Sequence, residues 1–414
     1  MTNYPTYKLG ELISETIGGD WGKVPDYQDD SYELAYCIRG AEYKNWASEK
    51  GSTAVLRKIK STNLLKRQLK EGDIIVEISG GGPEQPVGRT EVITKDVLDN
   101  FKGKKVICTN FLRLVRPNIR VVDSVFLNHY LKFFYSTGEI IKYQAGSNNL
   151  RNLKFNDYLS IPIPLPPLPT QRAIVTRIET LFAELDKAAV HLRTAQQQLK
   201  TYRQAVLNHW LNNEEGKWEM VKLGNIADVN TGSTPKRGNK DYWENGNIPW
   251  ITSGETNNPY ITKATEFITT KAIAETNCKI IAKGSLVIAM YGEGKTRGKC
   301  AELSIDATTN QALASITFTD SRMYKNFAKW FFEKNYEDMR MLSSGGVQPN
   351  LNLGIIKNMI LPLPPLAEQQ RIVNEIESRL SQATASETYI ENALQQAEAL
   401  RQSILKKAFS GELV

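Results

Sequence analysis

The sequence predicts an α+β fold in which two globular mixed α/β domains lie at opposite ends of an antiparallel two-helix coiled coil, as a pseudo two-fold internal repeat. Two observations lead to this prediction. The motif Leu165-Pro166-Pro167-Leu168 recurs 198 residues later as Leu363-Pro364-Pro365-Leu366. Behind each copy, from Thr170 and from Ala367, the chain continues without proline or glycine, and the two stretches match without a gap. Self-similarity over a long period is typical of a repeated architecture.

The repeat divides the chain into four segments. We expect a first globular domain over 1–163, a central helix over 164–213, a second globular domain over 214–361 and a C-terminal helix over 362–414. Proline is tolerated in the first turn of a helix but not inside one, so the Pro-Pro pairs suit the start of each helix.

Short motifs shared by the two globular domains indicate a common framework. They are Lys8-Leu9-Gly10 with Lys222-Leu223-Gly224, the strand Gly72–Val76 with Gly284–Ile288, Thr109-Asn110 with Thr309-Asn310, and Lys132-Phe133-Phe134 with Lys329-Trp330-Phe331. Elsewhere the two domains differ. Two recognition modules of different specificity would show this pattern, and so would any old duplication.

The apolar residues of the two long segments follow the heptad spacing of a coiled-coil seam. The seam is Ile174, Ile178, Leu185, Leu192, Leu199 and Val206 in the first segment, and Ile372, Ile376, Ile390, Ala397 and Ile404 in the second. We assign Leu181, Ala188, Ala195, Tyr202, Ala383, Ala393 and Leu400 to the same seam. The first helix leads to the second domain, where the second helix starts, so paired helices must run antiparallel. About forty residues would span roughly 60 Å.

The composition suits a basic protein that binds a polyanion, although an ordinary basic surface would look the same. The chain of 414 residues has 52 Lys and Arg against 45 Asp and Glu, a net charge of +7. Its four cysteines and three histidines are scattered without a CxxC pair, so we expect reduced cysteines, no metal site and a cytoplasmic location. We expect neither a signal peptide nor a membrane span.

Three local patterns suggest an enzyme, and the sequence argues against each. Ala289–Thr296 fits a loose phosphate-binding loop, but its counterpart in the first domain has no Lys-Thr. Pro25-Asp26 with Glu42-Tyr43-Lys44 fits a nuclease pattern, but the counterpart Glu255 is not followed by lysine. Asn257–Tyr260 lacks the second proline of a methyltransferase motif. We therefore expect no catalysis by this chain.

The repeated motifs resemble those of the specificity (S) subunits of type I restriction-modification systems. That family has a Leu-Pro-Pro-Leu-x-x-Gln run leading into a long helix that ends in Arg-Gln-x-x-Leu. The matching segments are Leu165–Gln171 with Arg203–Leu207, Leu363–Gln369 with Arg401–Leu405, the tail Ala408–Leu413, and Ala307–Ala312 in the second domain. The first domain departs from the pattern at Ile107–Phe111.

The resemblance implies a non-catalytic subunit of a type I adenine-specific DNA methyltransferase and ATP-dependent restriction endonuclease complex. Each target recognition domain would read one half of a bipartite, asymmetric site in double-stranded DNA. The helices would set the spacing and bind two modification subunits. S-adenosylmethionine, ATP and magnesium would act in the modification and restriction subunits and not in this chain. The alternatives are a coiled-coil scaffold that joins two proteins, and an autonomous nuclease or methyltransferase.

Candidate DNA contacts follow from residue type, because Lys and Arg bind phosphates while Arg, Asn, Gln, Ser and Thr read base edges. In the first domain the candidates are Arg39, Lys44, Arg57, Lys58 and Arg89. In the second domain they are the basic loop Lys295, Arg297 and Lys299, and then Thr231, Ser233 and Lys236. By residue type alone, each of the charged candidates is more often an ordinary solvated surface charge.

Overall fold

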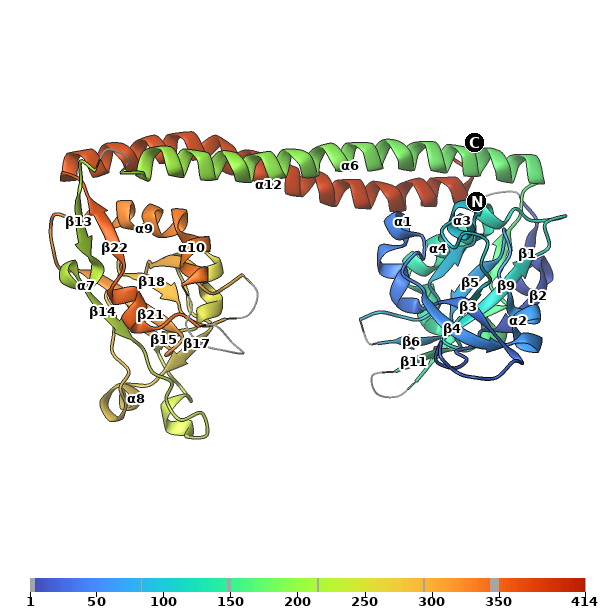
Figure 1. Cartoon of the computed structure of the whole chain (residues 1–414), viewed down its shortest axis with the longest axis horizontal. Helices are drawn as coiled ribbons and strands as arrows, with labels where there is room; N and C mark the ends of the chain where they lie inside the picture. Colours follow the sequence, from blue (N-terminus) through green and yellow to red (C-terminus); the bar gives the residue numbers. More distant parts are fainter. Residues whose placement is uncertain are drawn as a thin grey trace. The chain divides into compact units, whose positions relative to one another are not determined.

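The computed structural model describes residues 4–82, 84–146, 150–213, 216–292, 295–342 and 350–413 (Figure 1). The chain forms two compact units. The first unit comprises Met1–Leu192 and Asn392–Val414, and the second comprises Arg193–Glu391. Each unit therefore holds one globular domain together with part of each long helix.

The sheets of the first unit are mostly antiparallel and short. Strand β1 (Thr6–Lys8) pairs with β12 (Pro162–Pro164), and a four-stranded sheet has the order β2 (Ile13–Gly18), β9 (Leu112–Pro117), β5 (Ile74–Glu77), β7 (Thr90–Val92). A three-stranded sheet has the order β4 (Val55–Lys60), β3 (Tyr32–Ile38), β8 (Val106–Cys108), and a second has β10 (Gln144–Ala145), β11 (Arg151–Leu153), β6 (Ser79–Gly81). The α-helices of this domain are α1 (Trp46–Glu49), α2 (Ser61–Arg67), α3 (Lys95–Asp99), α4 (Ser124–Ser136) and α5 (Phe155–Tyr158).

The second unit repeats this plan. Strand β13 (Glu219–Lys222) pairs with β22 (Ile360–Leu363), and a five-stranded sheet has the order β14 (Ala227–Thr231), β21 (Leu313–Phe318), β18 (Leu286–Ala289), β19 (Cys300–Leu303), β16 (Tyr260–Ile261). A three-stranded sheet has the order β17 (Glu266–Ile268), β15 (Ile248–Ile251), β20 (Thr308–Thr309). Its helices are α7 (Leu223–Ile226), α8 (Thr270–Glu275), α9 (Lys325–Lys334), α10 (Tyr336–Met341) and α11 (Leu353–Lys357).

The strand orders confirm the internal repeat inside the globular domains. Strands β2-β9-β5-β7 correspond to β14-β21-β18-β19, and β4-β3-β8 correspond to β17-β15-β20. In both β4-β3-β8 and β17-β15-β20 the middle strand pairs antiparallel on one side and parallel on the other. Strands β5 and β18, which belong to the matching motifs Gly72–Val76 and Gly284–Ile288, are both buried along their whole length.

Two glycines occupy equivalent close approaches between these sheets. A Cβ atom at Gly19, after β2, would overlap the carbonyl oxygen of Thr109. A Cβ atom at Gly232, after β14, would overlap the carbonyl oxygen of Thr309. Glycine is required at both positions because any larger residue would push two backbone segments apart.

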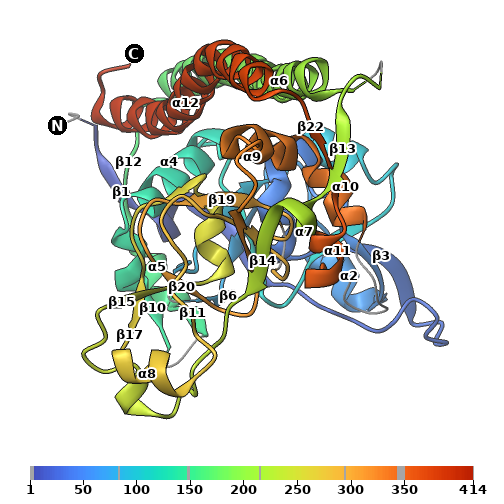
Figure 2. The ribbon, with the colours of Figure 1, turned by 90° about the vertical axis from the view of Figure 1, so that its left-hand side faces the viewer.

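Each domain packs one helix against its sheet and against the long helices of the same unit. In the second unit α9 lies between the long helices and the sheet in both views (Figures 1 and 2). Its Phe327 and Phe332 share one hydrophobic core with Ile372 and Ile376 of α12. In the first unit α4 takes the corresponding place. Its Phe126 lies in the core of the domain, and Asp123 caps the N-terminus of the helix.

The long helices are α6 (Leu168–Leu211) and α12 (Leu366–Ser410), and their contacts run antiparallel. In the first unit Arg401 pairs with Asp186, and in the second unit Arg203 donates to Thr384 at 3.1 Å. Moving 17 residues forward along α6 therefore moves the contact 17 residues back along α12. This register agrees with the predicted antiparallel pairing.

The positions predicted for the seam are buried to different degrees, and three of the additional positions are exposed. All of Ile174, Ile178, Leu185, Leu192, Leu199, Val206, Ile372, Ile376, Ile390, Ala397 and Ile404 are buried or half-buried. Ala188, Tyr202 and Leu400 are instead exposed, Tyr202 by 42% and Leu400 by 51%. Two paired helices bury only a narrow stripe, so part of the alternate set turns outward while other members, among them Leu181 and Ala195, stay half-buried.

Among the described residues no helix is both long enough and apolar enough to cross a membrane. Likewise, within the described ranges, no three His, Cys, Asp or Glu side chains come together as a possible metal site.

Candidate nucleic-acid interface

The loops that follow β2, β3, β5 and β8 of the first domain meet around a cleft of about 720 Å³. Three of the predicted DNA contacts, Arg39, Lys44 and Arg89, line this cleft. They come from positions far apart in the sequence, and the fold brings them together because β3 and β5 end at the same side of the domain.

Two of these cations are held in place by buried carboxylates. Nε and Nη2 of Arg39 donate to Oε1 of Glu42 at 3.0 and 2.5 Å, and Glu42 is 3% exposed. Nε and Nη2 of Arg89 donate to the two oxygens of Glu77 at 2.8 and 2.5 Å, and Glu77 is 2% exposed. Planar paired hydrogen bonds fix the guanidinium groups in one orientation.

The geometry also explains why the nuclease-like pattern at Glu42 is misleading. Oε2 of Glu42 accepts a hydrogen bond of 2.5 Å from the backbone N–H of Arg39, so the carboxylate caps its own helical turn. Glu255 of the second domain does the same, accepting from the backbone N–H of Thr252 at 2.9 Å. Both glutamates are therefore structural groups of equivalent turns.

The remaining first-domain candidates differ in their surroundings. Lys44 is exposed and makes no ion pair with any residue that the structure describes. The guanidinium of Arg57 lies 4.4 Å from the ring centroid of Trp21 and its Nε donates to the Trp21 carbonyl at 2.9 Å. Arg57 thus supports a tryptophan of the cleft. Lys58 lies on β4 and does not line this cleft, and its Nζ donates to the Tyr32 carbonyl at 3.3 Å.

In the second domain Thr231 is the last residue of β14, and Ser233 and Lys236 lie on the loop that follows it, which corresponds to the loop after β2. The Thr231 hydroxyl donates within the domain, to the carbonyls of Gln311 and Leu313 at 3.1 and 3.2 Å. The Ser233 carbonyl accepts from Trp250 Nε1 at 3.0 Å. These two residues stabilise the loop, whereas the side chain of Lys236 is exposed.

The three cations of the predicted basic loop have different surroundings. Lys295 is exposed, Arg297 is half-buried, and Lys299 donates from Nζ to Asn257 Oδ1 at 2.7 Å. Lys299 lines a different cleft of about 760 Å³, together with Lys200 and Arg203 of α6. The phosphate-loop pattern fails here as well, because β19 and not a helix follows this loop, whose residues 293–294 lie outside the described ranges.

Several polar and aromatic cleft residues were not predicted from the sequence. Trp21 and Phe111 are 38% and 49% exposed and line the first-domain cleft, together with Gln85 and Asn110. Asn110 belongs to the shared Thr-Asn motif, which is the only sequence signal that could have pointed to this set. An exposed aromatic ring beside side-chain amide groups is well suited to contact nucleobases.

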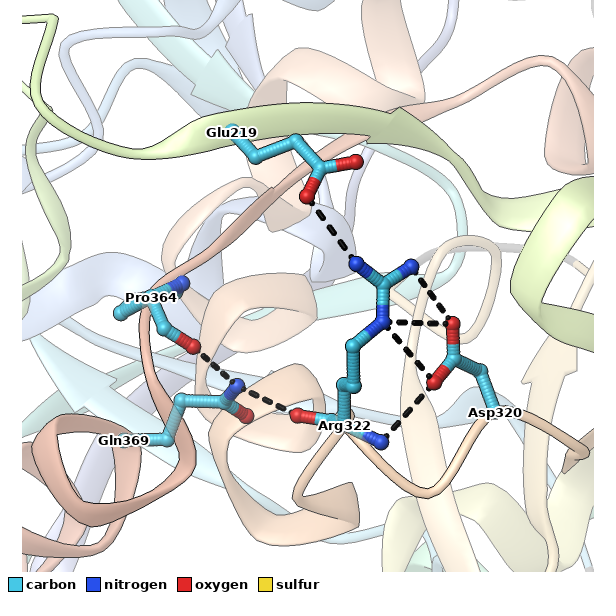
Figure 3. A network of polar contacts seen from close by, with 5 residues as sticks. All are labelled: Glu219, Asp320, Arg322, Pro364 and Gln369. Carbon is cyan, nitrogen blue, oxygen red and sulfur yellow. Dashed lines mark hydrogen bonds and ion pairs between the residues drawn. The ribbon is translucent and has the colours of Figure 1, made fainter.

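The repeated spacing of the Leu-Pro-Pro-Leu-x-x-Gln motif has a structural role at each helix start. Gln369 is fully buried, and its Nε2 donates to the carbonyls of Pro364 and Arg322 at 2.7 and 2.8 Å (Figure 3). Its Oε1 accepts from the backbone N–H of Tyr324 at 2.7 Å. The Arg322 side chain is fixed in turn by Asp320 and Glu219. The glutamine therefore ties the first turn of α12 to the loop before α9.

Comparisons with known proteins agree with this architecture. The family model for the type I restriction modification DNA specificity domain matches twice, over residues 31–190 and 215–396. The specificity subunit of the type I restriction enzyme EcoKI from Escherichia coli (strain K12) is 26% identical over 319 residues, covering 73% of this chain and 68% of that protein. The specificity subunit of the StySPI enzyme from Salmonella potsdam is 27% identical over 382 residues, covering 85% and 77%.

Solved structures show the same fold at low sequence identity. A chain from a study of complex assembly and conformational transition of the type I R-M system superposes with a TM-score of 0.76 at 19% identity, covering 100% of both chains. The HsdS subunit from Thermoanaerobacter tengcongensis superposes with a TM-score of 0.55 at 19% identity, covering 99% of this chain and 97% of that one. With two matched copies of its domain, the chain belongs to the type I restriction modification DNA specificity domain family.

Proposed function

We propose that this chain is the DNA-recognition subunit of a type I restriction-modification assembly, that each domain reads one half of a bipartite, asymmetric duplex site, and that the chain itself catalyses no step. One observation carries the proposal. The two domains share a strand order but differ at equivalent positions of their loops, and a common framework with different surface groups suits two different half-sites.

The equivalent positions can be identified from backbone hydrogen bonds. The N–H of Glu77 donates to the Arg89 carbonyl in the first domain, as the N–H of Ala289 donates to the Lys299 carbonyl in the second. The carboxylate that holds Arg89 is therefore absent from the second domain, and Lys299 binds an asparagine instead. Arg89 and Lys299 thus occupy equivalent positions with different partners, which supports the proposal that the two domains read unequal half-sites.

The paired helices are the proposed attachment surface for two modification subunits. Tyr202 and Leu400 are 198 residues apart, so they occupy the same place in the repeat, and both are exposed on their helices. A surface that occurs twice can bind the same partner twice. In this proposal S-adenosylmethionine, ATP and magnesium act in modification and restriction subunits, and the assembly works on DNA in the cytoplasm.

The proposal is tested against a protein scaffold and against an autonomous enzyme. Purified chain, alone and with modification subunits, is titrated with duplex DNA at several salt concentrations. DNA recognition requires binding that weakens steeply with salt, because phosphate contacts release counterions. Salt-independent or absent DNA binding by the assembly would favour the scaffold. Methylation or cleavage by the chain alone, given magnesium and S-adenosylmethionine, would contradict the non-catalytic role.

A further inference from the structure

The first-domain cleft contains an arginine whose orientation is set before any ligand arrives. Arg39 follows β3 directly, and its Nε and Nη2 are bound side-on by Glu42, which is nearly inaccessible to solvent. Its third nitrogen, Nη1, makes no hydrogen bond with any described residue, and the side chain is 38% exposed at the cleft. The guanidinium therefore turns its outer edge, with N–H donors, towards the cleft.

The groups around Arg39 fit a base pair edge better than a phosphate alone. Trp21 and Phe111 expose aromatic rings, and Gln85 and Asn110 offer amides that can both donate and accept. Gly40 lets the turn after β3 lie close to the Arg89–Glu77 pair, because a Cβ atom at this position would lie 3.3 Å from Glu77 Oε1 and 3.8 Å from Arg89 Nη2. A cleft with a fixed fork of donors and polar amides can distinguish bases.

We propose that Arg39, oriented by Glu42, is the residue with which the first domain reads a guanine, and this inference rests on the proposed function. Guanine is the base that presents two acceptors, O6 and N7, side by side in the major groove, and a guanidinium edge matches both. The half-site of the first domain therefore contains a G·C pair. At the equivalent position of the second domain stands Thr252, so that domain has no such guanine reader.

The chain supplies matched variants for the test. Arg39→Thr places at this turn the residue that the second domain already uses, where the Thr252 hydroxyl and backbone N–H both bind Glu255, so the turn is accommodated. Arg39→Lys keeps the charge and loses the fork. Arg116→Lys is the control, because Arg116 is also held side-on by a buried carboxylate, Asp73, but its third nitrogen is already bound by Glu15.

The experiment selects bound duplexes with the intact assembly of chain and modification subunits, from a library in which the half-site of the first domain is randomised. Wild type and Arg116→Lys should select the same G·C pair. Arg39→Thr and Arg39→Lys should lose that preference about five- to a hundredfold while keeping the other half-site. Replacing that guanine by 7-deazaguanine, which lacks the N7 acceptor, should weaken wild-type binding and leave Arg39→Thr unaffected.

Three results would overturn the inference while leaving the proposed function intact. They are a first half-site without a G·C pair, a guanine preference that survives in folded Arg39→Thr, and a loss of binding that is equal for all sequences, which would assign Arg39 to a phosphate. Failure of the wild-type assembly to select any bipartite site would instead contradict the proposed function.

Discussion

Gln171 and Gln369 make the same three hydrogen bonds in the two units. Gln171 donates to the carbonyls of Pro166 and Val121 at 2.8 and 3.1 Å and accepts from the Asp123 N–H at 2.7 Å, as Gln369 does with its own counterparts. Both glutamines are fully buried. The repeated motif is thus a repeated attachment of a long helix to its domain, and it fixes the direction in which each helix leaves.

Replacing either glutamine by alanine should destabilise its unit strongly. Gln369→Ala leaves the carbonyls of Pro364 and Arg322 and the N–H of Tyr324 without their partner, and we expect a loss of roughly 2–4 kcal/mol. Gln204→Ala, which changes an exposed glutamine of α6, is the control and should change stability little. Urea unfolding followed by circular dichroism measures both variants. Equal stability of the two would show that the buried glutamine is dispensable.

The glycine at the close approach should be irreplaceable in each domain. Gly19→Ala should destabilise the first unit and distort the cleft, because its methyl group meets the Thr109 carbonyl oxygen. Gly18→Ala, one residue earlier, meets no atom within 4 Å and serves as the control. Thermal unfolding of both variants gives the comparison. A melting temperature for Gly19→Ala at or above that of Gly18→Ala would contradict the predicted clash.

The first unit should lose stability as the pH falls because of His129. Burial, and secondarily the charge of Lys132, lowers the pKa of His129 to about 4. Its ring packs against Phe182 of α6 with centroids 5.9 Å apart. The unfolded chain takes up the proton near pH 6.5 and the folded chain near pH 4, so stability is complete above the higher value and declines between the two. The total is roughly 3 kcal/mol.

The His129→Phe variant tests this dependence. Both ring nitrogens of His129 are buried without a hydrogen-bond partner among the described residues, so phenylalanine loses no bond. Denaturant titrations from pH 7.5 to pH 4.5 should show a shallower decline for this variant than for wild type. His191→Phe, a change at an exposed position of α6, should keep the wild-type decline. Parallel curves for wild type and His129→Phe would show that another group is responsible.

If the paired helices set the distance between the half-sites, their length should control the spacer. Removing seven residues from each helix, at positions that face each other in the Asp186–Arg401 and Arg203–Thr384 register, preserves the heptads. Each helix becomes shorter by about 10 Å, roughly three base pairs of duplex at about 3.4 Å each. A folded variant that methylates its two half-sequences with an unchanged spacer would show that the helices do not act as a ruler.

The sequence predicted the fold better than the candidate interface, for a physical reason. The 198-residue offset and the heptads can be read directly from the order of the residues, so the repeat and the inward residues such as Ile178 and Ile376 follow from them. The outward turn of Tyr202 and Leu400 depends on how narrow a stripe the pairing buries. The Arg89–Glu77 ion pair and the different surroundings of Lys295 and Lys299 depend on tertiary packing. Residue type alone therefore could not tell which of these cations are available to DNA.

The central claim is that each domain reads its own half of the site. The most direct measurement is sequencing of methylated adenines in cells that express the modification subunits with either this chain or a chimaera in which residues 1–163 come from a relative. The account predicts that one half of the methylated motif changes while the other half and the spacer stay the same. A change in both halves, or in neither, by a folded and active chimaera would contradict it.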